Sequence, residues 1–351
     1  MDGQLSFFEE GLDTDSQIVK PPSDRQTDRQ TDHRTPLERK IDDSKDILRL
    51  AAEMSELYYQ KPLAITYSGG KDSDVLLYLA LECLKPSQFE VVNSHTTVDA
   101  PDTVYHIRET FKNLNEQGVK TSIQYPRDKD GNFESMWSLI VKNGIPPTRL
   151  ARYCCRVLKE TSLPNRFIAV GVRESESSGR KGKDSFTTRE KTKADAKFYN
   201  YEHTREVFET AKQKMIENNE KPNDHNVWDC NLITKAKDNI DLICYPIYKW
   251  LDSEIWMFIH DRGIKYNPLY DEGFQRVGCV GCPFAGNQRQ VLERFPKYKQ
   301  NYILAFDKMI RTSKKKKHNW ETGEDVYKWW IQDETIEGQM NIFDFIEKEG
   351  Q

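Results

Sequence analysis

The sequence predicts an α/β protein built on a doubly wound, mainly parallel β-sheet. Short apolar segments that can form buried strands alternate with segments of helical periodicity, at the spacing of βαβ units. The first such strand, Ala64–Tyr67, runs into a glycine-rich hexapeptide and then into an apolar helical pattern. We expect a disordered N-terminal tail over residues 1–44, the main domain over residues 45–290, and a small helical C-terminal extension with a tail over residues 291–351.

The N-terminal tail is expected to be disordered because of its composition. Few apolar residues follow Phe8, and the sequence Asp-Arg-Gln-Thr repeats within residues 24–32. Such a segment buries too little apolar surface to offset the entropy lost on ordering. An amphipathic pattern over residues 46–59 then predicts a helix that leads into the first strand.

The hexapeptide Ser68–Ser73 is the first candidate site. Gly69 and Gly70 allow a sharp turn with unobstructed backbone N–H groups, and Asp72 and Ser73 are placed to cap the following helix. The positive end of that helix favours a bound phosphate, and a lysine in the hexapeptide adds a charge. A plain glycine turn before a helix is the alternative.

The spacing of this hexapeptide differs from the Walker pattern. It resembles the PP-loop of the N-type ATP pyrophosphatases, which cleave ATP between its α and β phosphates. The resemblance implies ATP and Mg²⁺ as ligands. The nucleotide-binding candidates in the loop are Ser68, Gly69, Gly70, Lys71, Asp72 and Ser73.

The rest of the sheet is read from later apolar segments. Strands are expected at 89–93, 121–125, 167–171 and 241–247, and helices at 104–114, 136–142 and 249–260. The highly charged segment 181–197 is expected to form a loop.

Ligands of doubly wound sheets bind beyond the carboxyl ends of the strands. There Asp99 or Asp102 either binds Mg²⁺ or a ribose hydroxyl, or simply caps the next helix. Arg173 and Arg180 follow a later strand and are candidate phosphate ligands.

Four of the seven cysteines form two close pairs, Cys154-Cys155 and Cys279-Val-Gly-Cys282. Gly281 allows the tight turn that two thiolates on one centre require. Adjacent cysteines are unusual for tetrahedral zinc because consecutive side chains diverge, so the set favours a [4Fe-4S] cluster over structural zinc or unligated thiols. The metal-ligand candidates are Cys154, Cys155, Cys279 and Cys282.

Composition limits the other possibilities. The net charge of −4 and pI near 6.1 argue against affinity for nucleic acid over the whole surface, although a local basic site is compatible with them. The sequence lacks an eighteen-residue apolar run, so no membrane-spanning helix is expected. The N-terminus lacks the pattern of a signal peptide, and we expect a cytoplasmic location.

Two terminal peptides, Gln4–Phe8 and Gln339–Phe343, share a glutamine followed by apolar residues. Both resemble the motif that binds the replication sliding clamp, which implies a clamp as partner. The alternative is that they fold back on their own domain.

Taken together, the motifs resemble the adenylyl-sulfate and phosphoadenylyl-sulfate reductase family over roughly residues 46–290. The resemblance implies an adenine nucleotide α-hydrolase-like fold and assigns the cluster to the four paired cysteines. Those reductases use a C-terminal cysteine nucleophile, whereas no cysteine follows Cys282 here. Besides the hexapeptide and cysteines, the resemblance rests on Arg173-Glu174-Ser175, Trp250, Trp256 and Tyr266–Asp271.

The combination is most similar to the sulfurtransferases of bacterial DNA phosphorothioation systems, which work beside a cysteine desulfurase. This similarity implies an ATP-dependent iron–sulfur sulfurtransferase or adenylyltransferase acting on nucleic acid, with DNA and a cysteine desulfurase or another sulfur donor as partners. Lys71, Asp72 and Arg173 would be its catalytic residues. The alternatives are an adenylyl-sulfate or phosphoadenylyl-sulfate reductase and a non-catalytic, clamp-associated nucleotide-binding module.

Overall fold

The computed structural model describes residues 34–128, 130–160, 163–176, 181–188, 197–219, 241–312 and 320–331. From Pro36 onward these residues belong to one unit. Several residues named above lie outside the described ranges: both clamp-like peptides, Arg180, and nearly all of the tail.

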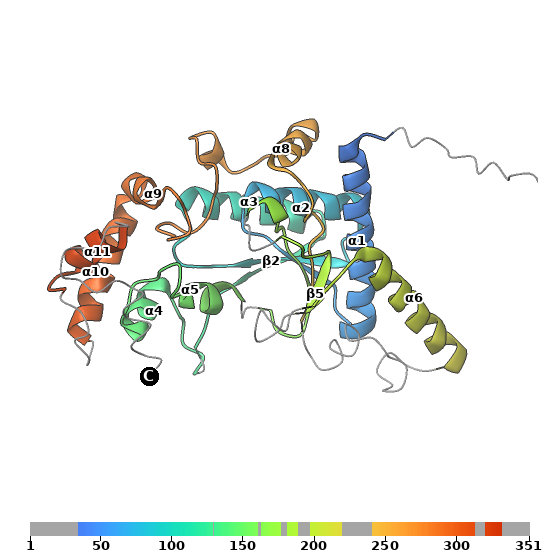
Figure 1. Ribbon diagram of the computed structural model, residues 1–351, viewed down its shortest axis with the longest axis horizontal. Coiled ribbons are helices and arrows are strands. Elements are labelled where there is room, and N and C mark those ends of the chain that lie inside the picture. The colour runs from blue at the N-terminus through green and yellow to red at the C-terminus, as the bar shows by residue number, and fades with distance from the viewer. Residues whose placement is uncertain are drawn as a thin grey trace, which may run out of the picture. The chain divides into compact units, whose positions relative to one another are not determined.

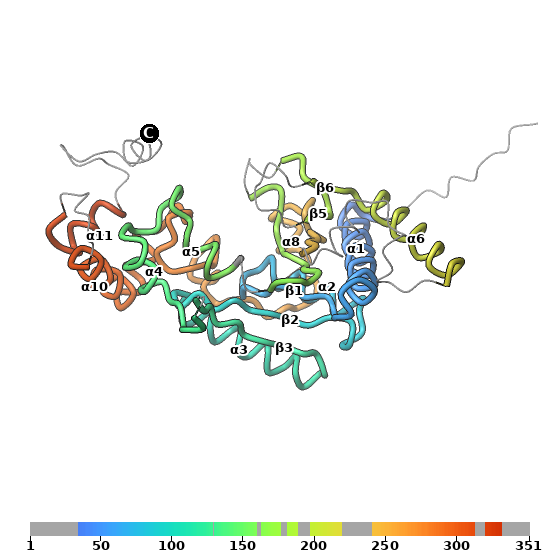
Figure 2. The backbone as a smooth tube through the Cα atoms, turned by 90° about the horizontal axis from the view of Figure 1, so that it is seen from below, coloured from blue at the N-terminus to red at the C-terminus, as the bar shows by residue number. Residues whose placement is uncertain are grey.

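The described part contains a seven-stranded sheet in the order β3-β2-β1-β4-β7-β5-β6. The strands from β3 to β7 in this order are parallel to their neighbours, and β5 and β6 add antiparallel pairs at one edge. Figure 2 shows β1, β2 and β3 side by side. The bounds are β1 Leu63–Thr66, β2 Phe89–Ser94, β3 Lys120–Gln124, β4 Phe167–Ala169, β5 Phe186–Thr188, β6 Phe198–Tyr199 and β7 Leu242–Cys244.

The strand order reverses beside β1, because β2 and β3 extend the sheet on one side while β4 and β7 extend it on the other. Such a reversal is where doubly wound sheets bind their ligands. The predicted fold class, a doubly wound and mainly parallel sheet, is therefore confirmed.

Helices α2 and α3 run over one face of this sheet (Figure 1). The helices are α1 Pro36–Tyr59, α2 Lys71–Cys83, α3 Pro101–Glu116, α4 Met136–Asn143, α5 Tyr153–Cys155, α6 Tyr201–Asn218, α8 Asp252–Asp261, α9 Gln288–Arg294, α10 Pro296–Thr312 and α11 Gly323–Ile331. A π-helical turn, Arg156–Glu160, follows α5 directly. None of the described helices combines the length and the apolarity needed to cross a membrane.

Helix α1 begins ten residues before its expected start, so residues 36–44 are helical and the predicted tail boundary at residue 44 is wrong. Tertiary contacts explain the difference. Ser44 is buried, its Oγ donates to the carbonyl oxygen of Pro246 (2.7 Å), and it accepts from Trp250 Nε1 (3.0 Å). These partners lie some 200 residues away in the chain, and local composition does not reveal them.

Two apolar cores support the unit. The larger one joins α1, α2 and α8 to the sheet, with Leu48, Ile65 and Phe258 fully buried. The second joins α4, α10 and α11 to the segments that carry the paired cysteines, around Val280 and Phe306. The C-terminal helices thus pack against the cysteine segments within a shared core.

Candidate active site

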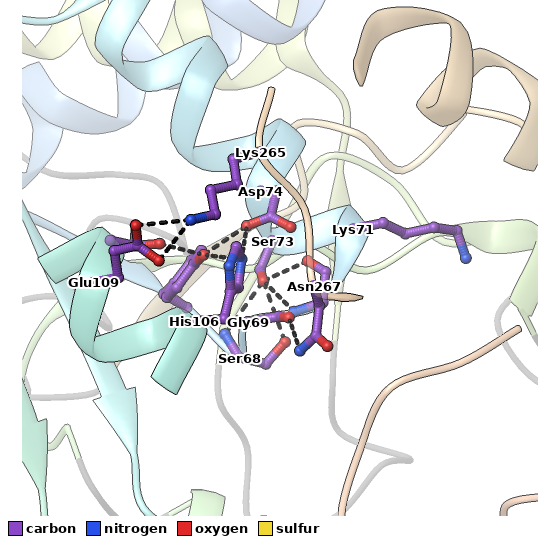
Figure 3. Close-up of polar contacts among 12 residues, drawn as sticks. Ser68, Gly69, Lys71, Ser73, Asp74, His106, Glu109, Lys265 and Asn267 are labelled. Carbon is purple, nitrogen blue, oxygen red and sulfur yellow. Dashed lines mark hydrogen bonds and ion pairs between the residues drawn. The ribbon is translucent and has the colours of Figure 1, made fainter. Parts of the chain in front are cut away.

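The phosphate loop Ser68–Ser73 leaves β1 where the strand order reverses (Figure 3). Gly69 has a φ of +71°, and its carbonyl oxygen accepts from Asn267 Nδ2 at 3.0 Å. Gly70 is the N-cap of α2. Ser73 Oγ accepts from the Gly70 amide (3.1 Å) and donates to the Gly70 carbonyl (2.7 Å). Ser73 therefore closes the cap as expected, whereas the expectation that Asp72 caps this helix is wrong.

Asp72 instead joins a charged group that we call the ion network: Lys71, Asp72, Arg173 and Asp252. Arg173 Nε lies 2.5 Å from Asp72 Oδ1, and its Nη2 lies 2.8 Å from Asp252 Oδ1. Lys71 Nζ lies 3.0 Å from the same Asp252 oxygen. Both cationic side chains are almost fully buried, whereas that of Asp252 is 59% exposed.

The two carboxylates of the network differ in their pKa. Burial raises the pKa of Asp72, even though Arg173 and Lys71 act in the opposite direction. Burial also acts upward on Asp252, but hydrogen bonds and charge from Lys71 and Arg173 outweigh it and lower the pKa of Asp252. The network therefore holds two buried cations beside the loop, with an accessible carboxylate as their shared counter-ion.

Lys71 has further neighbours that the sequence did not assign to the site. Its amide donates to Tyr270 Oη (3.0 Å), and its Nζ contacts the carbonyl oxygen of Gln275 (3.4 Å). The ammonium group lies over the rings of Trp256 (6.0 Å) and Tyr270 (5.5 Å). Tyr270 and Asn267 belong to the motif 266–271, and this motif was the only sequence feature that pointed to these two residues. Asp252, the first residue of α8, was not assigned to the site from the sequence either.

A buried polar network lies behind the loop (Figure 3). Tyr67 Oη donates to Asp74 Oδ1 (2.6 Å), and His106 Nε2 lies 3.0 Å from that hydroxyl and 3.2 Å from Asp74 Oδ1. Burial, with the nearby charge of Asp74, raises the pKa of Tyr67 well above its ordinary value, so the phenol stays neutral. This network ties the end of β1 to both α2 and α3.

Asp99 and Asp102 occupy different places. Asp99 accepts from the amide (3.0 Å) and hydroxyl (2.7 Å) of Thr96, and its backbone forms an isolated bridge with Cys279. Asp102 is the second residue of α3, whose N-cap, Ala100, receives no side-chain hydrogen bond. Neither aspartate caps the helix, and Asp99 lies beside the cysteine segments.

Three of the four paired cysteines, Cys155, Cys279 and Cys282, lie near Lys159, and the fourth, Cys154, contacts Cys155. The charges of Cys279, Asp99, Cys155 and Cys282 raise the pKa of this lysine, although part of its side chain remains exposed. A hydrogen bond from the Cys154 thiol lowers the pKa of Cys155 to about 5, assisted by Arg152 and Lys159. The same bond raises the pKa of Cys154.

Packing fixes the loop between the second pair. Gly281 has a φ of +74°, and a Cβ there would lie 2.9 Å from both Trp330 and Tyr302. Tyr302 Oη donates to the Val280 carbonyl oxygen at 2.9 Å. Within the described ranges, no three His, Cys, Asp or Glu side chains are grouped tightly enough for one metal ion.

The ion network and the cysteines are connected by a short segment. Gln275, which contacts Lys71, precedes Cys279 by four residues. Four residues span at most about 14 Å, so the two groups belong to one region.

Comparison with known proteins identifies the family. The phosphoadenosine phosphosulfate reductase domain matches residues 62–285. The uncharacterized protein MJ0066 of Methanocaldococcus jannaschii is 27% identical over 68% of this chain and 40% of its own length. Adenosine 5'-phosphosulfate reductase of Bacillus cereus is 24% identical over 64% of this chain and 74% of its own length.

Among solved structures, phosphoadenylyl-sulfate reductase of Candida auris aligns with 67% of this chain and 87% of its own, at 14% identity and a TM-score of 0.39. The chain spans about half of the length of the two M. jannaschii relatives that it matches. The domain match covers well over half of the sequence and includes the phosphate loop and all four paired cysteines. The chain therefore belongs to the phosphoadenosine phosphosulfate reductase domain family.

Proposed function

We propose that this protein is an ATP-dependent sulfurtransferase that activates an oxygen of a nucleic acid by adenylyl transfer. The observation that carries the proposal is the short connection between a phosphate loop with two buried cations and a group of four cysteines. The first part suits ATP cleavage, and the second suits sulfur chemistry.

The loop and ion network would bind the triphosphate. The phosphates would replace Asp252 as the partner of Lys71 and Arg173, because the exposed carboxylate of Asp252 can be displaced into water. Mg²⁺ commonly uses one or two protein carboxylates together with substrate phosphates, and Asp72 would serve this purpose once Arg173 turns to the phosphates. Fixed cations beside the breaking bond would stabilise the charge of the departing pyrophosphate.

The four cysteines would hold a [4Fe-4S] cluster. One tetrahedral ion with bonds of about 2.3 Å needs thiolates that nearly touch, whereas a cluster binds its thiolates at separate irons. The four thiols are half-buried; three lie near Lys159, the fourth contacts Cys155, and no three are grouped tightly enough for one ion, which suits the cluster better. When bound, the cluster would supply an iron–sulfur centre beside the substrate.

The proposed reaction has three steps. In the first, the acceptor oxygen attacks the α phosphorus of ATP, and the bond to the β phosphate breaks with release of pyrophosphate. In the second, the terminal sulfur of a persulfide on a donor protein, such as a cysteine desulfurase, attacks the atom that bears the adenylated oxygen, and AMP leaves with that oxygen. In the third, a further thiol attacks the donor's cysteine sulfur and breaks the S–S bond, so the transferred sulfur stays on the acceptor and the two thiols, which supply two electrons, end as a disulfide. The electron pair of each broken bond remains on the leaving group.

The test is pyrophosphate release from ATP by anaerobically purified protein, with and without DNA. Lys71→Ala should lower the rate about 100-fold or more, because it removes a buried charge beside the phosphates. Lys265→Ala is the matched control, since this exposed lysine pairs only with Glu109 among the contacts described. Loss of activity in both variants, or in neither, would count against the assignment.

A reductase of adenylyl sulfate or phosphoadenylyl sulfate is the second candidate, favoured by the reductase named among the relatives. Sulfite formation from either ester with a supplied thiol would select it. If neither pyrophosphate nor sulfite forms while nucleotide still binds, the non-catalytic module is the better description.

A further inference from the structure

We propose that the outer edge of the cysteine site is a stacking platform for an unpaired base of a nucleic acid. The platform consists of Arg149, Leu150 and Arg152 before the first cysteine pair, and Pro283 and Phe284 after the second. The inference rests on the proposed function in one respect: it takes the nucleic acid as the acceptor and says how it is held.

Contacts across the platform join the two cysteine segments. Arg149 Nε donates to the carbonyl oxygen of Pro283 at 3.1 Å, and the guanidinium carbon of Arg152 lies 4.7 Å from the centre of the Phe284 ring. These residues lie within five positions of a paired cysteine. A ligand on the platform would therefore lie at the edge of the cysteine group.

The platform exposes apolar surface that the fold itself does not use. Leu150 is 52% exposed and Phe284 is 39% exposed, and neither belongs to the second core, against which their neighbours Ala151 and Cys279 pack. An aromatic ring paired with an arginine offers the flat surface on which bases stack, and such stacking tolerates any base. Bases within a duplex have both faces covered by their neighbours, so the platform suits an unpaired nucleotide.

Charge also favours a nucleic acid over other partners. Segments 149–159 and 273–292 together contain six Lys or Arg residues and no Asp or Glu, in a chain whose net charge is −4. The nearby carboxylates are Asp99, which lies close to Lys159, and Glu160, Glu272 and Glu293, which flank these segments in the sequence. The local excess of cations over carboxylates attracts a phosphate backbone. Arg149 uses only Nε in its contact with Pro283, so its terminal nitrogens can bind a phosphate.

The experiment measures binding of a fluorescent single-stranded DNA, the same sequence as RNA, and the corresponding duplex, by anisotropy, to the anaerobically purified full chain. Single strands should bind more tightly than the duplex, with an affinity that falls as salt rises. Phe284→Ala should weaken single-strand binding roughly tenfold, and Phe284→Tyr should restore it. Phe133→Ala is the matched control, because Phe133 is 52% exposed elsewhere on the surface.

Equal affinity of wild type and Phe284→Ala would overturn the platform, as would tighter binding of the duplex or equal losses with Phe133→Ala. Whether DNA or RNA binds better identifies the acceptor. The two proposals fail in different ways. If the wild-type protein releases pyrophosphate but its binding of single strands does not depend on Phe284, the platform is refuted and the proposed function is not. Phe284-dependent binding without pyrophosphate release keeps the platform and refutes the ATP-dependent reaction.

Discussion

At Gly69 the phosphate loop adopts a φ of +71°, and a Cβ there would lie 2.9 Å from Ile107 Cγ1. Gly118 has a similar φ of +81° but open space around it. Gly118→Ala should cost about 1 kcal/mol through backbone strain alone. Gly69→Ala should cost at least about 1 kcal/mol more because the methyl group overpacks the loop against α3. Urea unfolding of both variants measures the difference. Equal losses in the free energy of unfolding would show that the Ile107 side chain moves aside without cost.

Asp252 gives the ion network a predictable response to acid. Its folded pKa lies below the unfolded value of about 3.9, so its pairing stabilises the fold fully above that pH. The stabilisation is lost as the pH falls through the folded pKa. Asp252→Asn should therefore destabilise the protein near neutral pH and have a smaller effect near about pH 3. Unfolding measured at both values tests this, and a difference independent of pH would assign the effect to something other than charge.

At the scale of elements, the sequence reveals those that have their own local signal. Most of the parallel strands are predictable because they are apolar runs followed by a turn, whereas β3, with Ile123 as its one apolar residue, has a weaker signal. Strand β5 is not, because Phe186–Thr188 lies in a charged segment that was expected to be a loop and is buried only by pairing with β7 and β6. The N-terminal part of α1 was missed for the same reason, since its partners are distant in sequence.

The candidate site also has a part that the sequence reveals and a part that only the fold reveals. The loop Ser68–Ser73 and the cysteine pairs carry their chemistry in short motifs, so they were identified without the fold. Asp252 reaches Lys71 only through tertiary folding, and no local pattern assigns it to the site. Tyr270 lies in the motif 266–271, but its contact with Lys71 also requires the fold. The closeness of Gln275 to Lys71, which links the two groups, also requires the structure.

Helix α11 packs into the second core, and Trp330 is its largest buried side chain. This side chain is 7% exposed, its Nε1 donates to the Pro147 carbonyl oxygen (2.6 Å), and its ring packs on Tyr302 at 4.6 Å. Trp330→Ala should cost about 3–5 kcal/mol. Trp329→Ala removes the adjacent, less buried tryptophan and should cost clearly less. Chemical denaturation of the two variants decides, and equal costs would mean that α11 is not anchored through its buried face.

At the scale of the whole molecule, the two cores position different parts of the site. The larger core places the phosphate loop and ion network, and the second core places the cysteines. Segment 275–279 connects them, running from the Lys71 contact to the first thiol of the second pair. A displacement of residues in either core can therefore be transmitted to the other core through segment 275–279.

This division predicts what removal of the proposed iron–sulfur cluster does. A group that binds only the native state stabilises the elements that carry its ligands, so a chelator should lower hydrogen-exchange protection in α4, α10 and α11. Helices α1 and α2, in the larger core, should keep their protection because none of the paired cysteines lies in them. Hydrogen exchange with mass spectrometry, before and after chelation, makes the comparison.

A control for this experiment is Cys83→Ser, which changes a cysteine outside the two pairs and should leave iron content unchanged. Cys282→Ser should lower iron content and reproduce the exchange pattern of the chelated protein, because one change removes a ligand and the other removes the metal. If protection fell equally in both cores, the cluster would stabilise the unit as a whole. If it fell in neither, the cysteines would hold no group that supports the fold.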